Sequence, residues 1–343
     1  MSLASPALAG TPSTNLKPPN RFICYNHQMK ILGIETSCDE TSASIVENGT
    51  RVVSLVTATS LPLHQKTGGI VPENAARKQV EYMIPVIKEA VKDQDFDAIA
   101  VTETPGLIGS LVVGIETAKA LSLFLNKPLY SVNHIQGHIY SLWLNDSSAT
   151  PEFPFVCLVV SGGHTELYLA KSHKEYILLG ATRDDAVGEC FDKVARVLGL
   201  EYPGGPAIDA CVSIAPNYKL LNTNYYSLPR PMINSGDCEF SFSGLKTAVY
   251  KIATSQKLTA NQVIQLAFEF REAAVDVLIA KLLLAAKKNG IKRLAIVGGV
   301  SANTLLRKRL QSLANGYTIY LPQLKYTGDN ASMIASAAHF QNL

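Results

Sequence analysis

The sequence predicts an α/β protein that consists of two similar α/β domains with a ligand cleft between them. With 343 residues and 47% hydrophobic composition, the chain can bury two cores of roughly 150 residues each. A strand, a polar turn and a second strand begin at Lys30, and the same layout recurs from Phe155. Each copy is followed by crossover helices, which is typical of a duplicated α/β fold. Ligands of such folds bind at the carboxyl ends of strands, where the motifs described below fall.

The first domain is predicted at residues 30–150 and the second at 151–343, after a disordered extension at 1–29. Hydrophobic periodicity defines the elements. In the first domain they are a three-stranded meander from Lys30, a helix at about 73–92, a strand at 97–102, a helix at about 109–126, a strand at 131–133 and a helix that carries two histidines. In the second domain they are a meander from Phe155, helices at about 187–199, 243–255 and 259–289, a strand at 293–299, a helix at about 302–314, a strand at 318–322 and a last helix.

The net charge of +3 comes entirely from the start of the chain. Lys17, Arg21 and Lys30 supply it, because the first thirty residues contain no Asp or Glu. The remaining 28 basic residues (31 minus these 3) balance 28 acidic residues. A neutral body does not indicate nucleic-acid binding, so a nucleic-acid surface would be a local patch or would belong to a partner.

The cysteines and the N-terminal segment bear on the cellular compartment. The six cysteines are scattered and form no C-x-x-C pair, which argues against a zinc ribbon or a disulfide framework and predicts a reducing cytoplasm. No apolar run approaches the roughly 18 uncharged residues of a membrane span. Residues 1–28 lack acids and resemble a transit peptide in part, but their four prolines disfavour an amphipathic targeting helix. A disordered tail, or a start at Met29, is therefore preferred to mitochondrial import.

The motif N-H-I-Q-G-H follows a predicted strand and places His134 and His138 four residues apart. On a helix this spacing puts both imidazoles on one face, where they can share a metal ion, although solvated or core histidines show the same spacing. Asp329, in T-G-D-N-A, is a candidate third ligand, and its alternative role is a helix N-cap. A zinc protease is disfavoured, because the H-E-x-x-H glutamate is absent between the histidines.

Glycine pairs and acids mark further strand ends. V-S-G-G-H-T at 160–165 and V-G-G-V-S-A-N at 297–303 can bring backbone amides close to an anion, but ordinary tight turns look the same. The segment 187–209 carries Asp192 and Asp209, and its P-G-G-P sequence predicts a rigid loop; a plain helix followed by a turn is the alternative. The first turn, G-I-E-T-S-C-D-E-T at 33–41, places acids where they favour contacts with the water shell of a metal over phosphate binding.

Nine motifs in order closely resemble the bacterial-type tRNA N6-adenosine threonylcarbamoyltransferase family, once labelled a glycoprotein endopeptidase. They are GIETSCDETS, TGGIVPENAARKQ, TETPGLIGSLVVG, NHIQGH, VSGGHTELYL, GECFDKVARVLGLEYPGGPAID, FSFSGLKTAV, VGGVSANTLLR and TGDNASM, and they cover about residues 30–340. The departures are small: the family often has Ala where Cys190 stands, and Ala or Ser varies at Ser301. Neither position is an expected ligand.

The resemblance implies an actin-like ATPase fold and transfer of threonylcarbamoyl from threonylcarbamoyl-AMP to N6 of adenosine 37 in tRNAs that read codons beginning with A. It implies that His134, His138 and Asp329 hold one divalent ion, Fe(II) first and Zn(II) as the alternative. Asp39 and Glu40 are expected to contact those ligands without binding the metal themselves. The residues expected to bind the adenylate are Val159, Val160, Ser161, Gly162, Gly163, Asp192, Gly205, Asp209 and Asn303.

The resemblance also implies partners: a paralogous subunit of the same fold and a small ATPase, or a homodimer in its place. Direct transfer is expected, because the adenylate is already activated and needs no side-chain nucleophile. Two other functions remain open at this point. A sugar kinase or simple ATPase would share the fold, although the paired histidines disfavour it, and a non-catalytic scaffold would retain its partners without the metal ligands.

Overall fold

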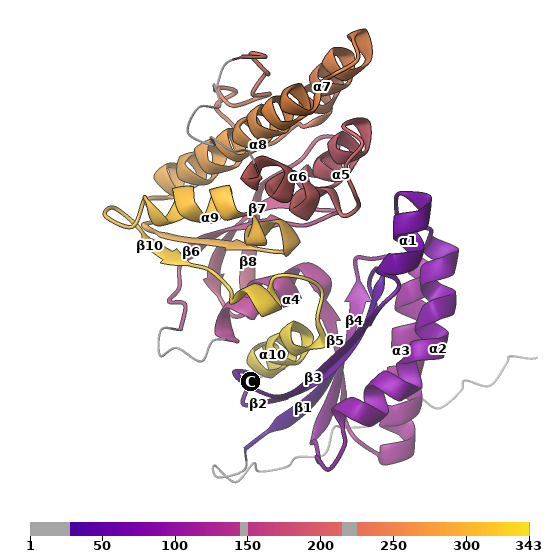
Figure 1. Ribbon diagram of the computed structural model, residues 1–343. Helices are drawn as coiled ribbons and strands as arrows, with labels where there is room; N and C mark the ends of the chain where they lie inside the picture. Colours follow the sequence, from indigo (N-terminus) through magenta and orange to yellow (C-terminus); the bar gives the residue numbers. More distant parts are fainter. Residues whose placement is uncertain (1–27, 145–149, 215–224, 343) are drawn as a thin grey trace, which may run out of the picture.

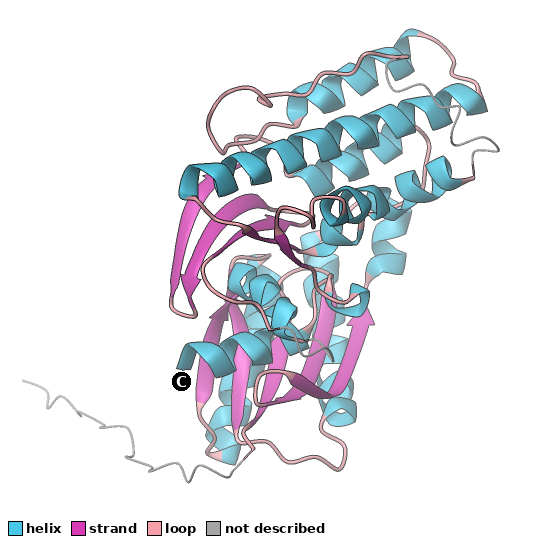
Figure 2. Ribbon diagram, turned by 90° about the vertical axis from the view of Figure 1, so that its left-hand side faces the viewer, coloured by secondary structure: helices cyan, strands magenta, loops and turns pink. Residues whose placement is uncertain are grey.

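The computed structural model describes residues 28–144, 150–214 and 225–342. Its two five-stranded sheets have the strand orders β3-β2-β1-β4-β5 and β10-β9-β6-β7-β8. In each sheet, three antiparallel strands adjoin two parallel strands, so the second sheet repeats the topology of the first. Figures 1 and 2 show the two lobes stacked on each other. The predicted duplication of an α/β unit is confirmed.

The first lobe matches the predicted order of elements and adds one helix. Its elements are β1 (Lys30–Glu35), β2 (Glu40–Glu47), β3 (Arg51–Thr59), α1 (Leu61–Thr67), α2 (Pro72–Ala90), β4 (Ala98–Thr104), α3 (Ile108–Leu125), β5 (Leu129–Asn133), α4 (His134–Tyr140) and the 3₁₀ turn η1 (Ser141–Trp143). The added helix, α1, has a proline in its first turn and ends at Gly68 in the left-handed region, as short helices commonly do. The predicted extension at 1–29 lies outside the described residues, except for its last two.

The second lobe contains one element that the sequence analysis assigned wrongly. Its elements are β6 (Phe155–Val160), β7 (Thr165–Ser172), β8 (Glu175–Ala181), α5 (Val187–Val197), α6 (Gly204–Ser213), α7 (Ser243–Ser255), α8 (Ala260–Asn289), β9 (Arg293–Val297), η3 (Gly299–Ala302), α9 (Thr304–Gln311), β10 (Thr318–Tyr320), η4 (Leu324–Tyr326) and α10 (Ala331–Asn342). The P-G-G-P segment is not a loop: α6 begins at Gly204 with Pro203 as its N-cap. Pro206 fits there because the first helical turn needs no N–H donor.

The last helix, α10, returns to the first lobe. The backbone N–H of Ala331 donates to Ser42 Oγ at 3.0 Å, and the hydroxyls of Ser44 and Ser332 lie 2.7 Å apart. A Cβ on Gly33 would lie 2.2 Å from the carbonyl oxygen of Ala331, so only glycine allows this approach. Figure 1 shows α10 beside β1 and β2. The predicted boundary at 150/151 therefore separates the two sheets but assigns α10 to the lobe on which it does not pack.

Strand β6 is buried on both faces, which explains its uninterrupted apolar run. Val156, Leu158 and Val160 belong to a core that includes α5 and α8. The alternate residues Cys157 and Val159 belong to a second core that also contains α4 and α10. This second core joins the lobes and supports the loops that carry the motifs.

Helix α3 has the length and composition of a membrane span, and 22% of it is buried. It packs against α2 and β4 of its own lobe, and Glu116 and Lys119 form an ion pair on it. Length and composition alone are weak evidence for a span. The exposed side of α3 therefore forms, with the neighbouring α2, one surface of the first lobe.

Candidate metal centre and substrate cleft

The two histidines lie at the first and last turns of the short helix α4. Strand β5 ends at Asn133, whose Oδ1 accepts hydrogen bonds from the N–H groups of Ile135 and Gln136 at 2.9 and 3.2 Å. This cap starts the helix at His134. The four-residue spacing then brings the ring centroids of His134 and His138 to 4.6 Å from each other, on one face of the helix as predicted.

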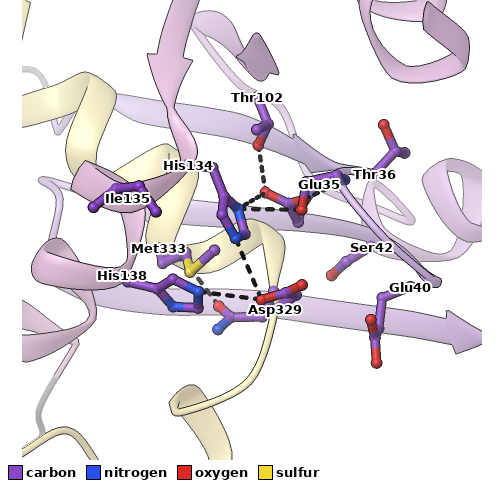
Figure 3. A network of polar contacts seen from close by, with 12 residues as sticks. Glu35, Thr36, Glu40, Ser42, Thr102, His134, Ile135, His138, Asp329 and Met333 are labelled. Carbon is purple, nitrogen blue, oxygen red and sulfur yellow. Dashed lines mark hydrogen bonds and ion pairs between the residues drawn. The ribbon is translucent and has the colours of Figure 1, made fainter. Parts of the chain in front are cut away.

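Asp329 meets both imidazoles from the loop before α10 (Figure 3). Its Oδ1 lies 3.2 Å from His138 Nε2 and 3.6 Å from His134 Nε2. Asn330, and not Asp329, caps the N-terminus of α10, because Asn330 Oδ1 accepts a hydrogen bond from the N–H of Met333 at 3.1 Å. The carboxylate of Asp329 is therefore left to face the histidines. The ligand atoms of the three residues all lie within 4.8 Å of one another.

Gly137 lets α4 approach α10 closely enough for this meeting. A Cβ at Gly137 would lie 2.7 Å from Ile334 Cδ1, which is closer than carbon atoms pack without one of them moving. The glycine between the two histidines therefore serves the packing of the helix against the element that follows Asp329.

The donor set fits a divalent metal ion. His138 is fully buried, its Nδ1 has no hydrogen-bond partner within the described part of the chain, and its Nε2 faces the Asp329 carboxylate at 3.2 Å. Buried polar atoms without partners are rare in proteins and call for an explanation such as a bound ion. Two imidazoles and one carboxylate are also a common set for catalytic metals, since they leave coordination positions open.

In the absence of a metal ion, the side chains of the cluster favour their charged forms, the imidazolium of His134 and the carboxylate of Asp329. Burial lowers the pKa of His134, but the carboxylates of Asp329 and Glu35 outweigh it and raise the pKa to about 9. Burial raises the pKa of Asp329, and the imidazoles of His134 and His138 outweigh it, so this pKa lies below its usual range. The cluster thus concentrates negative potential that suits a cation.

Glu35, at the end of β1, holds His134 in place. It is fully buried, and its Oε2 lies 3.3 Å from His134 Nδ1 and accepts a hydrogen bond from the Thr102 hydroxyl. Its Oε1 accepts from the backbone N–H of Ser37. A carboxylate on Nδ1 leaves Nε2 available for a metal. The sequence analysis placed Glu35 in the polar first turn and did not include it among the candidate site residues.

Asp39, in the turn between β1 and β2, and Glu40, the first residue of β2, are the predicted supporting acids. In the described residues, the hydrogen bonds to the His134 ring come from Glu35 and Ser37 and not from these acids. Burial, followed by the nearby carboxylates of Asp39 and Asp329, raises the pKa of Glu40. They remain candidates for contact with a substrate or a water.

The predicted adenylate residues of β6 and its turn are exposed only in part, at Gly162 and Gly163. The side chains of Val159 and Val160 are buried in the two cores, so only their backbone is available to a ligand. A Cβ at Gly162 or Gly163 would meet nothing within 4 Å, which leaves open space over the turn. The N-terminus of α5 supports this turn from behind, since the N–H of Glu189 donates to the carbonyl of Gly162 at 3.1 Å.

The remaining predicted residues lie on α5, on α6 and at the N-cap of α9, and three of them take part in two hydrogen-bonded pairs. Asp209 Oδ1 accepts from Asn303 Nδ2 at 2.9 Å, and Asp192 Oδ1 accepts from the N–H of Gly204 at 2.7 Å. Burial raises the pKa of Asp192 to about 6. A Cβ on Gly205 would meet nothing within 4 Å, so a ligand has room to approach. The structure thus places both pairs in the second lobe, apart from the histidines of α4.

A cavity of about 660 Å³ lies elsewhere, at the C-terminal end of α8, where Leu283, Lys287 and Tyr317 are among its lining residues. None of the predicted site residues lines it. Cavity size alone therefore does not identify the site, whereas the convergence of polar side chains does.

Comparison with known proteins is consistent with this geometry. The family model of tRNA N6-adenosine threonylcarbamoyltransferase matches residues 51–336. A curated protein of that name from Dehalococcoides mccartyi strain BAV1 is 46% identical over 318 residues, which covers 91% of this chain and 94% of the relative. A relative of the same name from Thermomicrobium roseum is 44% identical, and the match covers 91% of this chain and 92% of the relative. Another from Listeria innocua is also 44% identical, and the match covers 90% of each chain.

Two solved structures share the fold at low sequence identity. Full-length HypF in its phosphate- and nucleotide-bound form superposes with a TM-score of 0.58 at 14% identity, over 92% of this chain and 55% of HypF. The (R)-2-hydroxyglutaryl-CoA dehydratase component A of Acidaminococcus fermentans gives 0.51 at 13% identity, over 91% of this chain and 98% of that protein. At such identity the likeness shows the fold alone, and this fold is the actin-like ATPase fold.

Proposed function

Because the chain belongs to the tRNA N6-adenosine threonylcarbamoyltransferase family, we propose that it transfers a threonylcarbamoyl group to N6 of adenosine 37 in tRNAs that read codons beginning with A. The donor is threonylcarbamoyl-AMP, and AMP is released. The observation that supports this proposal most strongly is the convergence of the ligand atoms of His134, His138 and Asp329 within 4.8 Å of one another. An ATPase or sugar kinase of the same fold has no need of this cluster.

One divalent ion, Fe(II) or alternatively Zn(II), would be held by His134, His138 and Asp329. When bound, it supplies Lewis-acid chemistry at an oxygen of the reacting acyl group. The chain's own contribution is orientation. Glu35 fixes the His134 ring through Nδ1, and the cap at Asn133 fixes the start of the helix.

The adenylate is proposed to bind along the second lobe. The Ser161–Gly163 turn would approach its phosphate, while Asp192, Asp209 and Asn303 would approach its nucleoside. The nucleophile is N6 of the tRNA base: its bond to the carbamoyl carbon forms, the bond from that carbon to the phosphate oxygen breaks, and N6 loses a proton to water. Cys38, in the first turn, is a poor alternative nucleophile, because burial, followed by Asp329 and other nearby carboxylates, raises its pKa and keeps the thiol protonated.

A partner subunit is proposed to bind the exposed face of α2 and α3, here called the α2/α3 face. Its large apolar side chains have exposed fractions between 51% and 86%: Val80, Ile84, Ile108, Val112, Leu123 and Phe124. Three ion pairs on the same helices, Glu73–Arg77, Glu81–Lys78 and Glu116–Lys119, balance its charge. An apolar face without excess charge favours a protein over an anionic membrane or tRNA phosphates.

We propose that the occupant of this face is the corresponding helix pair of a same-fold subunit, either a paralogue or a second copy of this chain. The small ATPase is proposed as a further partner, with no surface assigned to it. A cytoplasmic location is proposed as well, in keeping with the five free cysteines of the described residues.

The function is tested by incubating the purified full-length chain with threonylcarbamoyl-AMP, unmodified tRNA and each candidate partner, and by detecting the modified nucleoside by mass spectrometry. His138→Ala is expected to lose both bound metal and product. Absence of product from the unmodified chain with every partner would refute the proposal. Phosphorylation of a small polyol in its place would support the kinase, and unchanged partner-dependent activity in the variant would support a scaffold.

The α2/α3 face is tested by size-exclusion chromatography with light scattering. Phe124→Asp is expected to abolish association with the same-fold partner, or self-association, and to leave the melting temperature unchanged. Tyr250→Asp on α7 is the control, because Tyr250 is 54% exposed on the other lobe. Association that survives Phe124→Asp would show that the partner binds elsewhere.

A further inference from the structure

His164 lies in the turn between β6 and β7 and faces the metal cluster from the second lobe. Its ring centroid is 6.4 Å from that of His134, with the ring planes at 50°. The ligand candidates His134 and His138 belong to the first lobe, and Asp329 precedes the helix that packs on the same lobe. His164 thus stands on the opposite side of the space in which the reacting groups must meet.

Ser161 is the hydrogen-bond partner of the His164 ring, and one of the two neutral tautomers uses the serine hydroxyl as its donor. The backbone N–H of His164 donates to Ser161 Oγ at 3.2 Å, so the serine hydroxyl acts there as an acceptor. Its own hydrogen can then be donated to His164 Nδ1, which lies 3.4 Å away. With Nδ1 accepting, the proton of the neutral ring is on Nε2. In this tautomer the His164 side chain carries its N–H donor at Nε2.

The turn that carries His164 is held rigidly. The N–H of Ser161 donates to the carbonyl of His164 at 2.9 Å, and Thr165 begins β7 in register with Val160. A Cβ on Gly188 of α5 would lie 2.4 Å from the carbonyl oxygen of Ser161, so the helix packs directly on the turn. A donor fixed in this way does not need to reorient during a reaction.

The two rings are too far apart to bond to each other directly. Ring nitrogens lie about 1 Å from their centroid, so the nearest nitrogens of His134 and His164 are about 4 Å or more apart, which is beyond hydrogen-bond distance. A single oxygen between the lobes can be reached from both sides. His164 is also outside the cluster of three residues whose ligand atoms all lie within 4.8 Å of one another.

We propose that His164 is a catalytic residue: its Nε2–H donates a hydrogen bond to the phosphate oxygen of the adenylate that gains negative charge as the bond to the carbamoyl carbon breaks. The electron pair of that bond stays on the AMP oxygen, the new bond forms to N6, and the N6 proton passes to water. The phosphate oxygen is assigned to His164 because the adjacent Ser161–Gly163 turn is the proposed phosphate site. This inference rests on the transferase function proposed above.

Two substitutions of His164 test whether its Nε2–H donor, and not the rest of the imidazole ring, is what the reaction requires. His164→Gln keeps an N–H group near the position of Nε2, whereas His164→Asn reaches only the position of Nδ1. His164→Asn is expected to lower kcat about 100-fold, as loss of one preorganised donor does, with bound metal and KM for tRNA unchanged. His164→Gln is expected to recover at least about tenfold of that loss. His339→Gln, the same change on α10, is the control and is expected to retain activity.

The experiment uses the full chain with the partners that support product formation, and it measures metal content and melting temperature for every variant. Wild-type kcat in His164→Asn would overturn the proposal, and so would loss of metal in that variant, because His164 would then be a ligand. Equal loss in His164→Gln would indicate a structural role. If His164→Asn does not fold, Ser161→Ala replaces it: kcat is expected to fall about tenfold because Nδ1 loses its donor, and an unchanged kcat would refute the proposal. Inactivity of the unmodified chain would instead refute the transferase function.

Discussion

Replacing Glu35 with Gln tests whether this buried carboxylate sets the affinity of the metal centre. In the wild type, Oε1 accepts from the Ser37 N–H, and Oε2 faces both the Thr102 hydroxyl and His134 Nδ1. An amide has one acceptor oxygen. If that oxygen faces Ser37, the NH₂ group faces the N–H of His134; if the amide is flipped, the NH₂ group faces the Ser37 N–H. In either orientation, one buried N–H group of the protein faces the N–H group of the new amide and has no acceptor.

The expected loss follows from this mismatch. A buried donor without an acceptor costs about 1–3 kcal/mol, and loss of a carboxylate partner to a metal-binding histidine lowers affinity about 10- to 100-fold. We therefore expect Glu35→Gln to weaken Zn(II) binding about 10- to 100-fold, as measured by competition with a chromophoric chelator on metal-free protein.

Glu40→Gln is the matched control for this measurement. Glu40 begins the strand that follows the same turn, and no described hydrogen bond joins it to an imidazole, so the expected change in affinity is less than about threefold. Unchanged affinity in Glu35→Gln, or an equal loss in Glu40→Gln, would show that the first turn acts through its charge and not through the contact to His134.

Three further substitutions test packing and charge. Asp192→Asn removes a carboxylate whose pKa is raised from 3.8 to about 6 by burial; the stability that the protonated group contributes in the wild type is complete below pH 3.8 and is lost as pH rises through 6. The variant should gain about 1.4 kcal/mol relative to wild type between pH 5 and pH 8 in urea titrations, and no gain would mean that Asp192 is not shifted. Gly137→Ala should cost about 1–3 kcal/mol and weaken metal binding by pressing on Ile334, whereas Gly316→Ala, where a Cβ meets nothing within 4 Å, should not. Asn133→Ala should cost about 1 kcal/mol through the lost cap, and Asn133→Asp, measured in the same titration, should retain stability.

Much of the fold could be predicted because its signals are local. The two meanders, the long helices and the spacing of His134 and His138 follow from periodicity within short windows. The resemblance of nine motifs added the fold family, which the comparisons confirm. The wrong loop at Pro203–Pro206 arose because a proline and two glycines suit both a turn and the first turn of a helix.

What the sequence analysis missed depends on contacts between distant parts of the chain. Glu35 ends an apolar strand, and its partners Thr102 and His134 are 67 and 99 residues away, so its burial has no local signature. His164 was recognised only as part of a glycine turn, because its distance from His134 depends on how the lobes pack. Asp329 could be proposed as a ligand, but its release from the capping role became visible only with the contact between Asn330 and Met333.

The return of α10 to the first sheet has a consequence for how the protein is made. The first lobe is synthesised early, yet the helix that covers β1 and β2 comes from residues 331–342, and Asp329 emerges from the ribosome just before it. The nascent first lobe therefore exposes an apolar sheet face until α10 has been synthesised. A chain that stopped before Asp329 would lack both a candidate ligand and this cover, so the metal centre and the covered first sheet both depend on synthesis of the segment from Asp329 through α10.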